Sequence, residues 1–283
     1  MKNNNQFLKV KDHSVSGESF DLILNEEQDI LITSPQPKLE NLGAYYKSED
    51  YISHTDSNRN LLEQVYHLVR KSALKKKLRL INSFKNEEKN LLDIGCGTGD
   101  FLETAKNNGW QITGIEPDKN ARKIARSKTD NNVFETEHLQ NLKPQSFDVI
   151  ALWHVLEHLP NLEEHINIFN HLLKPNGRIV IAVPNYKSYD AEYYKSFWAA
   201  YDAPRHLWHF SQNGMKRIFK EKGFLSDRIY PMLFDSFYVS LLSEKYKSGF
   251  MNPFKAFLVG LRSNLKAKRT GEYSSLIYTF KKD

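Results

Sequence analysis

Three observations predict an α/β fold built on a parallel sheet that helices cover on both faces. From residue 90 onward, short apolar runs alternate with segments of helical periodicity, a pattern typical of a doubly covered parallel sheet. A glycine-rich turn follows the first apolar run directly. An acidic residue, Glu116, ends the second run, at the edge where open α/β sheets bind their ligands.

The apolar runs predict five parallel strands, two further strands and the helices between them. The five strands are expected at 90–94, 111–115, 132–135, 147–152 and 178–183. Helices are expected from Gly99, from Asp118, over 161–173, and from the N-cap Ser211 to Gly223. A strand near 227–230 and a last strand over 275–280 complete the sheet. We therefore predict a seven-stranded Rossmann-like mixed sheet of order 3-2-1-4-5-7-6, with strand 7 antiparallel.

The composition divides the chain into three parts. Alternating apolar residues around Phe20 and Ile30, followed by a Ser-Pro-Gln-Pro segment, predict a small β arm over 1–40. Amphipathic spacing from Leu61 onward predicts one or two helices in a cap over 41–88. The main domain is expected over 89–283, with a lid at 186–212 and a helical insertion at 235–272.

Charge and cysteine content limit the partners and the compartment. The net charge of +6 arises from Lys and Arg mixed among Asp and Glu along the 283 residues, so no specific nucleic-acid partner is predicted. One cysteine excludes an internal disulfide and favours a reducing compartment. The first residues have no apolar signal region, and no apolar run approaches the length of a membrane span. We expect a cytoplasmic protein.

The glycine turn gives the strongest functional signal. Asp93 ends a buried strand, and Gly95, Gly97 and Gly99 follow at alternate positions. A dinucleotide fold places its third glycine one residue later, and Asp100 would repel a pyrophosphate. S-adenosylmethionine (SAM) has no phosphate, so Asp93 and the loop carbonyls can hold its ammonium instead. The turn therefore favours SAM over a dinucleotide, although a glycine turn without a ligand is the simpler alternative.

The sequence here resembles the class I SAM-dependent methyltransferases over roughly residues 89–230. The resemblance implies that the glycine loop lies at the methionine part of SAM and that the acid of strand two lies at its ribose. It implies cofactor contacts for Asp93, Gly95, Cys96, Gly97, Gly99, Glu116, Pro117, Glu137, His138 and Leu139, the last three near adenine. Cys96 is interpreted as a small loop residue, with a nucleophilic role as the alternative.

The segment after the fourth predicted strand contains H-x-x-E-H, from His154 to His158. On a long helix this motif would place two zinc ligands one turn apart. Pro160 leaves too little room for such a helix. The phrase instead resembles the equivalent edge of ubiquinone-biosynthesis O-methyltransferases, which implies that Trp153 and His154 border the cofactor. His158 is then a general base or a helix-cap residue.

The lid contains a cluster of polar and aromatic residues after the fifth parallel strand. An acceptor pocket is predicted from Asp202, Arg205, His206 and His209. His206 is the second candidate base. The alternative is a packed lid with an internal Asp–Arg pair. No Asn/Asp-Pro-Pro-Tyr/Phe motif follows strand four, and no paired acidic metal ligands stand out, so neither DNA-base methylation nor a metal is expected.

Both ends of the chain add candidates. The arm resembles a small zinc ribbon that has lost its thiolates, with Asn25 and Gln28 at the second cysteine pair. The segment after it resembles one that such enzymes fold over SAM, which implies cofactor contacts for Tyr51 and His54, with surface packing as the alternative. Near the other end, an apolar helix face within 254–269 is flanked by Lys and Arg. This face touches a membrane surface or a lipid-linked acceptor, or it packs on its own sheet.

These interpretations converge on a SAM-dependent methyltransferase acting on a small-molecule, sugar or lipid-linked acceptor, with O-methylation favoured. A non-catalytic SAM-binding protein and an NAD-dependent oxidoreductase are the alternatives. Direct displacement at the methyl carbon needs no metal in this scheme, and a base only for a hydroxyl acceptor. The sequence does not name the acceptor or the oligomeric state.

Overall fold

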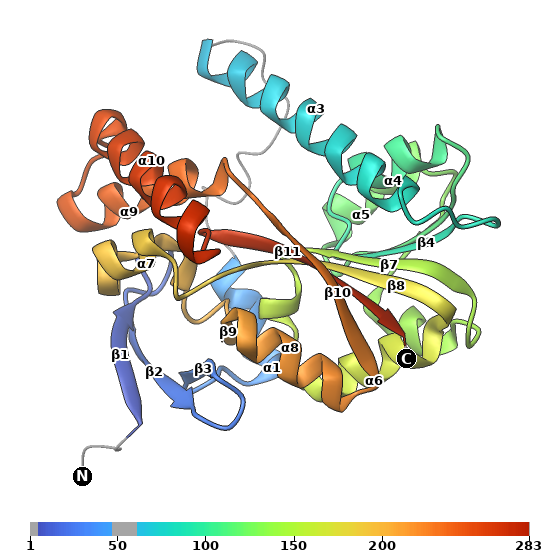
Figure 1. Cartoon of the computed structure of the whole chain (residues 1–283), viewed down its shortest axis with the longest axis horizontal. Coiled ribbons are helices and arrows are strands. Elements are labelled where there is room, and N and C mark those ends of the chain that lie inside the picture. The colour runs from blue at the N-terminus through green and yellow to red at the C-terminus, as the bar shows by residue number, and fades with distance from the viewer. Residues whose placement is uncertain (1–4, 47–60, 283) are drawn as a thin grey trace.

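The computed structural model describes residues 5–46 and 61–282, with side chains described for 5–46 and 71–282. Its main sheet has seven strands in the order β10-β11-β8-β7-β4-β5-β6 (Figure 1). These strands are β4 (Asn90–Ile94), β5 (Gln111–Ile115), β6 (Val133–Phe134), β7 (Phe147–Trp153), β8 (Leu173–Pro184), β10 (Phe224–Pro231) and β11 (Ser275–Lys282). Strands β6, β5, β4, β7 and β8 pair in parallel, and β11 is antiparallel to both β8 and β10. The predicted strand order is confirmed.

Alternate residues of the central strands face opposite layers of the core. Leu91 and Val149 pack with α4 (Asp100–Lys106) and α5 (Lys119–Lys128) on one face, whereas Leu92 and Ile150 pack with the helices on the other. Those helices are α6 (Leu162–Leu172) and α8 (Gln212–Glu221). One long helix, α3 (Leu61–Asn82), lies on the α4 side (Figure 1). Burial on both faces explains why these strands read as continuous apolar runs.

Strand β8 differs from its predicted start. A helix ending at 173 and a strand beginning at 178 were predicted, but α6 ends at Leu172 and β8 begins at Leu173. Leu173 pairs with Phe147, and an irregularity in register follows before Val149 pairs with Arg178. Asn176 absorbs this irregularity with a φ of 64°. Asn tolerates that conformation, so Pro-Asn-Gly bends the strand instead of preceding it.

The N-terminal arm is part of a second sheet of order β1-β2-β3-β9. Its first three strands are β1 (Gln6–Lys11), β2 (Ser19–Asn25) and β3 (Ile30–Ser34). The fourth, β9 (Trp208–Phe210), comes from the lid and was not predicted, because three residues give too short an alternation to detect. Asn25 and Gln28 hydrogen-bond each other across the β2–β3 turn, at 3.1 and 3.2 Å. Amide hydrogen bonds thus close the turn at which the resemblance places two thiolates. Two short helical turns, α1 (Leu39–Leu42) and η1 (Gly43–Tyr46), follow β3.

The lid and the insertion form a helical layer beside this second sheet (Figure 1). The lid folds into α7 (Tyr189–Tyr194), η4 (Lys195–Phe197) and η5 (Ala199–Tyr201), and the insertion into α9 (Asp235–Ser248) and α10 (Pro253–Thr270). Helix α10 buries small residues against α9, where a Cβ added at Gly260 would lie 2.7 Å from the ring of Phe237. Large apolar side chains of α10 face outward, being 38% to 73% exposed: Phe254, Phe257, Leu258, Leu261 and Leu265. Among the described residues, no helix is long and apolar enough to cross a membrane.

Candidate active site

The glycine loop after β4 is a tight backbone turn. Gly95, Gly97 and Gly99 have φ values of 66°, 55° and 80°, which glycine adopts without the cost that a Cβ brings. Amides of Gly95 and Cys96 both donate to the Ile115 carbonyl, at 2.8 and 3.1 Å, and so join the loop to the end of β5. A Cβ at Gly95 would lie 2.4 Å from Val155. Close packing therefore requires glycine at position 95.

Gly97, in contrast, faces open space. A Cβ built there would meet no heavy atom within 4 Å. We call this open space the cradle. Beside it, the Gly97 amide donates to Oε2 of Glu116 (2.7 Å), and the Asp118 amide donates to Oε1 (2.9 Å). A carboxylate has about four lone-pair sites, so Glu116 keeps acceptor capacity for ligand hydroxyls. The two predicted parts of the cofactor site, the loop and the strand-two acid, are in direct contact.

Asp93 lies near the carboxyl end of β4, just before the loop, and is only 1% exposed. One of its carboxylate oxygens, Oδ1, has no hydrogen-bond partner among the described residues. Burial raises the pKa of Asp93 to about 7; nearby Glu116 also raises this pKa, whereas Lys77 lowers it. A buried carboxylate with unused acceptor capacity fits the ammonium of SAM, and this orphaned oxygen is the observation that tests the fit.

Trp153 borders the same region. The Lys77 ammonium lies 4.2 Å from the centre of its ring, a cation–π geometry. Its indole nitrogen is buried without a hydrogen-bond partner among the described residues. Lys77 was not predicted, because it belongs to α3, a helix whose packing against α4 depends on tertiary structure.

The remaining predicted cofactor residues line the β5 and β6 edge. Burial raises the pKa of the Cys96 thiol well above its usual range, with Asp93 and Glu116 adding to the effect. A thiol that is hard to ionise does not support the alternative of a nucleophile. The carbonyls of Glu116 and Pro117 both accept from Arg122, at 2.6 and 2.9 Å. The adenine candidates Glu137, His138 and Leu139 lie on η2 (Thr136–Asn141).

Two of the adenine candidates have visible packing roles. His138 stacks on Phe134 with ring centres 4.1 Å apart, and Leu139 is buried in the main core. Tyr51 and His54 lie outside the described residues, so their predicted contact with the cofactor has no structural counterpart here.

His154 follows β7 in a strained conformation. Its φ is 58°, unusual for a residue with a side chain. Its Nε2 lies 3.2 Å from Oδ2 of Asp235, and its Nδ1 lies 3.4 Å from Oε1 of Glu157. Burial opposes protonation, but the two carboxylates outweigh it and raise the pKa of His154 to about 10. Asp235 was not predicted, because it begins α9, far along the chain.

The two candidate bases meet edge to face. The rings of His158 and His206 have centres 4.5 Å apart. Nδ1 of His158 lies 3.0 Å from the Arg205 carbonyl and 3.0 Å from the Tyr46 hydroxyl. Burial, together with nearby His206, lowers the pKa of His158 to about 4, so this imidazole is neutral at neutral pH. The structure thus brings together two histidines that lie 48 positions apart in the sequence.

Glu157 lies beside this histidine pair and is 1% exposed. Its Oε1 lies at ion-pair distance from Nδ1 of His154, but neither carboxylate oxygen accepts a hydrogen bond from the described residues. Burial favours the neutral acid, but His154, His206 and His158 outweigh it and lower the pKa of Glu157, so the group is a carboxylate. Glu157 belongs to the H-x-x-E-H motif, but no role was predicted for it.

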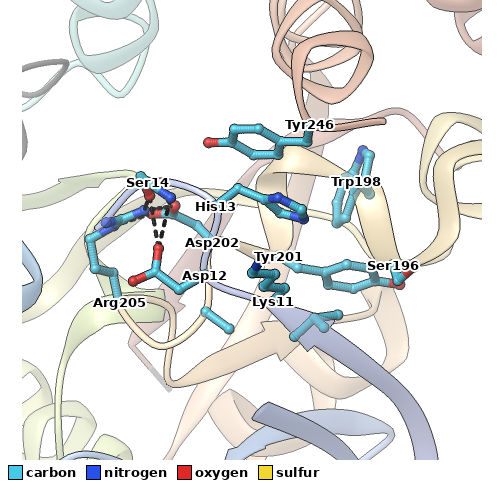
Figure 2. Close-up of a pocket in the computed structure, with 12 residues that line it drawn as sticks. Lys11, Asp12, His13, Ser14, Ser196, Trp198, Tyr201, Asp202, Arg205 and Tyr246 are labelled. Carbon is cyan, nitrogen blue, oxygen red and sulfur yellow. Dashed lines mark hydrogen bonds and ion pairs between the residues drawn. The ribbon is translucent and has the colours of Figure 1, made fainter. Parts of the chain in front are cut away.

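The predicted acceptor residues of the lid are largely used within the protein, as Figure 2 shows for Asp202 and Arg205. Arg205, 7% exposed, forms a buried ion pair with Asp202 and also donates to the Ser14 hydroxyl and, at 2.9 Å, to the Tyr45 carbonyl. The cavity beside it encloses about 10 Å³, room for about one water molecule. These contacts favour a packed lid over an acceptor pocket at Arg205.

His209 also faces inward. Its Nε2 lies 3.0 Å from the hydroxyl of Thr33 in β3, and that hydroxyl donates to the His206 carbonyl at 2.6 Å. Burial lowers the pKa of His209 well below its usual value. His209 therefore joins the lid to the arm.

Comparison with known proteins agrees with this architecture. Residues 61–225, more than half of the chain, match a protein family described as a methyltransferase domain. The seven-stranded order with an antiparallel strand and the glycine loop at its centre define the class I SAM-dependent methyltransferase fold that the sequence predicted. The chain belongs to this methyltransferase domain family.

Similar proteins include enzymes of ubiquinone biosynthesis. The chain is 32% identical over 104 residues to a ubiquinone biosynthesis O-methyltransferase of Idiomarina loihiensis, and 31% identical over 104 residues to that of Photobacterium profundum. Each match covers 34% of this chain and 43% to 44% of the relative. The chain thus matches less than half the length of these curated relatives.

Solved structures resemble the fold at lower identity. Magnesium protoporphyrin IX methyltransferase from Synechocystis PCC 6803, with bound SAH, gives a TM-score of 0.55 at 14% identity, covering 84% of this chain and 97% of that one. A SAM-dependent methyltransferase from Archaeoglobus fulgidus gives 0.52 at 21% identity, covering 79% of this chain and all of that one. These similarities show the fold.

Proposed function

We propose that the protein transfers the methyl group of SAM to an oxygen atom of a small-molecule acceptor. The observation that supports this most is the open space at Gly97, beside the Glu116 carboxylate and in the loop that follows the buried, partly unpartnered Asp93. Family membership supports methyl transfer. Similarity to ubiquinone-biosynthesis O-methyltransferases supports oxygen as the acceptor atom.

The proposed cofactor contacts follow from this placement. Asp93 binds the ammonium, the backbone of 95–99 lines the methionine part, and Glu116 with Pro117 lies at the ribose. Residues 137–139 lie near adenine, while Trp153 and His154 lie toward the sulfonium, and Tyr51 and His54 remain proposed contacts. Bound there, SAM supplies a methyl group that is already a strong electrophile. The side chains only have to hold the acceptor oxygen in line, about 3 to 3.5 Å from the methyl carbon, and exclude water.

A hydroxyl acceptor must also lose its proton as the carbon–oxygen bond forms and the carbon–sulfur pair returns to sulfur. We assign two roles to His158 and His206: they position the acceptor oxygen, and they promote the loss of its proton. His158 is half-buried and neutral, which suits both tasks. Asp202, Arg205 and His209 support the acceptor site by holding the lid on the arm.

We propose that the acceptor is lipid-linked and reaches the enzyme at an anionic membrane surface in the cytoplasm. The exposed apolar face of α10 continues into Phe250 and Met251, which are also exposed, and α10 has Lys and Arg around this face. Helix α9, packed beside it, contributes Asp235 to the contact with His154. Vesicle flotation tests this: Phe254→Ser should weaken binding, and Leu39→Ser, also an exposed apolar residue, should not.

Incubation of the purified protein with SAM and fractionated extract tests the main proposal. S-adenosylhomocysteine and a singly methylated product should form, and Glu116→Ala should lose SAM affinity with the fold intact. Glu164→Ala, an exposed acid on α6, is the control. SAM binding without product from any fraction would favour a non-catalytic SAM-binding protein. Calorimetry that showed NAD binding in place of SAM would favour an oxidoreductase.

A further inference from the structure

Glu157, His158 and His206 form a compact cluster at the carboxyl end of β7. Glu157 and His158 lie on η3 (Leu156–His158), and His206 comes from the lid just before β9. One possible ligand atom from each of the three residues lies within 4.8 Å of the others. The Leu207 amide donates to the Glu157 carbonyl (2.8 Å), which fixes the lid backbone against η3. Three side chains from two distant segments are thus held together by the backbone.

Both imidazoles hold a backbone carbonyl with the same nitrogen. Nδ1 of His206 lies 2.9 Å from the Ala200 carbonyl, and Nδ1 of His158 lies 3.0 Å from the Arg205 carbonyl. A carbonyl oxygen can only accept, so each Nδ1 carries the proton and donates it. Each Nε2 is then left with a lone pair, and that of His206 lies 3.9 Å from Oδ2 of Asp202. A backbone carbonyl behind Nδ1 is the usual way in which a metal-binding histidine is oriented.

The buried carboxylate of Glu157 indicates that these lone pairs bind a cation. It is 1% exposed and, although His154 lies at ion-pair distance, neither of its oxygens accepts a hydrogen bond from the described residues, a costly state for an ionised group. His154 lies between Glu157 and Asp235. Even when this imidazole is protonated, one positive charge faces two carboxylates. A cation bound by Glu157 would remove the imbalance and use both Nε2 lone pairs.

We propose that Glu157, His158 and His206 bind one first-row divalent metal ion, with Zn²⁺ as the best fit. Two imidazoles and one carboxylate suit Zn²⁺ and its transition-metal neighbours, whereas Mg²⁺ prefers a set of oxygen ligands. Tetrahedral Zn²⁺ with bonds of ~2.0 to 2.2 Å separates its ligand atoms by about 3.3 Å. From separations of at most 4.8 Å, an inward shift of about 1.5 Å or less would suffice.

The role of the metal rests on the proposed function. Three protein ligands leave one coordination position open, as in catalytic zinc sites. An acceptor hydroxyl bound there would lose its proton to solvent more readily, because the cation stabilises the oxyanion. That oxygen would then form its bond to the methyl carbon as the carbon–sulfur bond breaks. The histidine pair would thus act on the acceptor through the metal and would not itself take the proton.

The H-x-x-E-H motif suggests a different ligand set. In the metalloprotease arrangement, the ligands would be His154 and His158 on one helix, with Glu157 as a base. Here η3 is a single turn, and His154 contacts Asp235 and Glu157. The third ligand comes from the lid, so the sequence motif alone does not reveal the site.

Titration of the EDTA-treated, full-length protein with Co²⁺ tests the site without SAM or an acceptor. The visible absorption of bound Co²⁺ should saturate at one equivalent, and Zn²⁺ should displace it. Glu157→Gln and His206→Ala should each weaken binding at least tenfold. His165→Ala, which removes a half-buried histidine of α6 outside the cluster, should bind as the wild type does. His158→Asn is a further variant in case either buried-site variant fails to fold, as judged by circular dichroism.

Absence of one-equivalent binding, or full binding in the folded Glu157→Gln and His158→Asn variants, would overturn the metal site. The catalytic role has a separate test. EDTA should abolish methyl transfer, and added Zn²⁺ should restore it, while transfer at full rate after EDTA would overturn the role of the metal in the reaction. If no methyl transfer is found at all, the proposed function fails, and the Co²⁺ titration still decides the metal site.

Discussion

The cofactor loop (residues 95–99) and the lid cluster (Asp202, Arg205, His206 and His209) lie at the carboxyl edge of the sheet but are assembled in different ways. The loop and Glu116 lie within 25 residues of each other and are joined by hydrogen bonds between adjacent strand ends. The lid cluster depends on contacts such as Thr33 with His206 and Arg205 with Ser14, which span more than 170 residues. Local segments are sufficient to build the first region, whereas the second exists only in the folded chain.

Arg205→Met should give the largest effect if the lid depends on these long-range contacts. The substitution leaves Asp202 without its buried partner and removes the bonds to Ser14 and Tyr45. Losing one partner of a buried pair costs 3–5 kcal/mol in general; we expect about 3 kcal/mol in the free energy of unfolding, because the Asp202 side chain is 24% exposed. Urea denaturation measures this.

Arg217→Met is the matched control for the arm contact. Arg217, on α8 just after the lid, also bonds to the arm, with one bond of 2.8 Å to the Glu27 carbonyl, but it is exposed. Its loss should cost less than about 0.5 kcal/mol. If Arg205→Met costs no more than this control but weakens acceptor binding, Arg205 belongs to an acceptor pocket and the packed-lid interpretation is wrong.

This difference also explains what the sequence could predict. The boundaries of β4 and β5 were predicted correctly, because both strands are short apolar runs ended by a glycine turn or by Glu116. Strand β9 was missed, since its pairing with β3 depends on residues 178 positions away, as in Leu31 with His209. The roles of Glu157 and Asp235 were missed for the same reason. Their significance lies in what surrounds them, which no local pattern contains.

Gly97→Ala tests whether the cofactor loop binds SAM at Gly97. The new methyl group would enter the open cradle without meeting protein atoms, so the fold should tolerate it apart from strain at φ 55°. We expect SAM affinity to fall at least 30-fold, about 2 kcal/mol by the usual relation. Gly109→Ala is the control, because Gly109 also has a positive φ (82°) and an open Cβ position. Calorimetry that gave equal affinities for both variants would remove the cradle from the site.

The affinity for SAM should also depend on pH through Asp93. Burial raises the pKa of this carboxyl to about 7, so it becomes neutral as the pH falls below that value and no longer attracts an ammonium. From pH 7.5 to 5.5, Kd should rise, approaching tenfold per unit at the acid end. Asp93→Asn should bind weakly with a flatter profile. Asp148→Asn, which alters a buried acid at the far end of β7, should keep the wild-type profile, and a flat wild-type profile would contradict the assignment.

The smallest expected effect concerns the exposed face of α10. It tests whether this face binds a membrane. Lys268 is exposed in the last turn of α10, and a basic residue near an anionic bilayer contributes about 1 kcal/mol to binding. Lys268→Ala should therefore weaken binding to phosphatidylserine vesicles about fivefold and leave binding to phosphatidylcholine vesicles unchanged. Lys123 is an exposed residue of α5, beside the cofactor loop, and Lys123→Ala should change neither binding. Equal losses for the two lysines would mean that net charge, and not the α10 face, attracts the membrane. A dimer seen by light scattering and broken by Phe254→Ser would instead assign that face to a second copy of the chain.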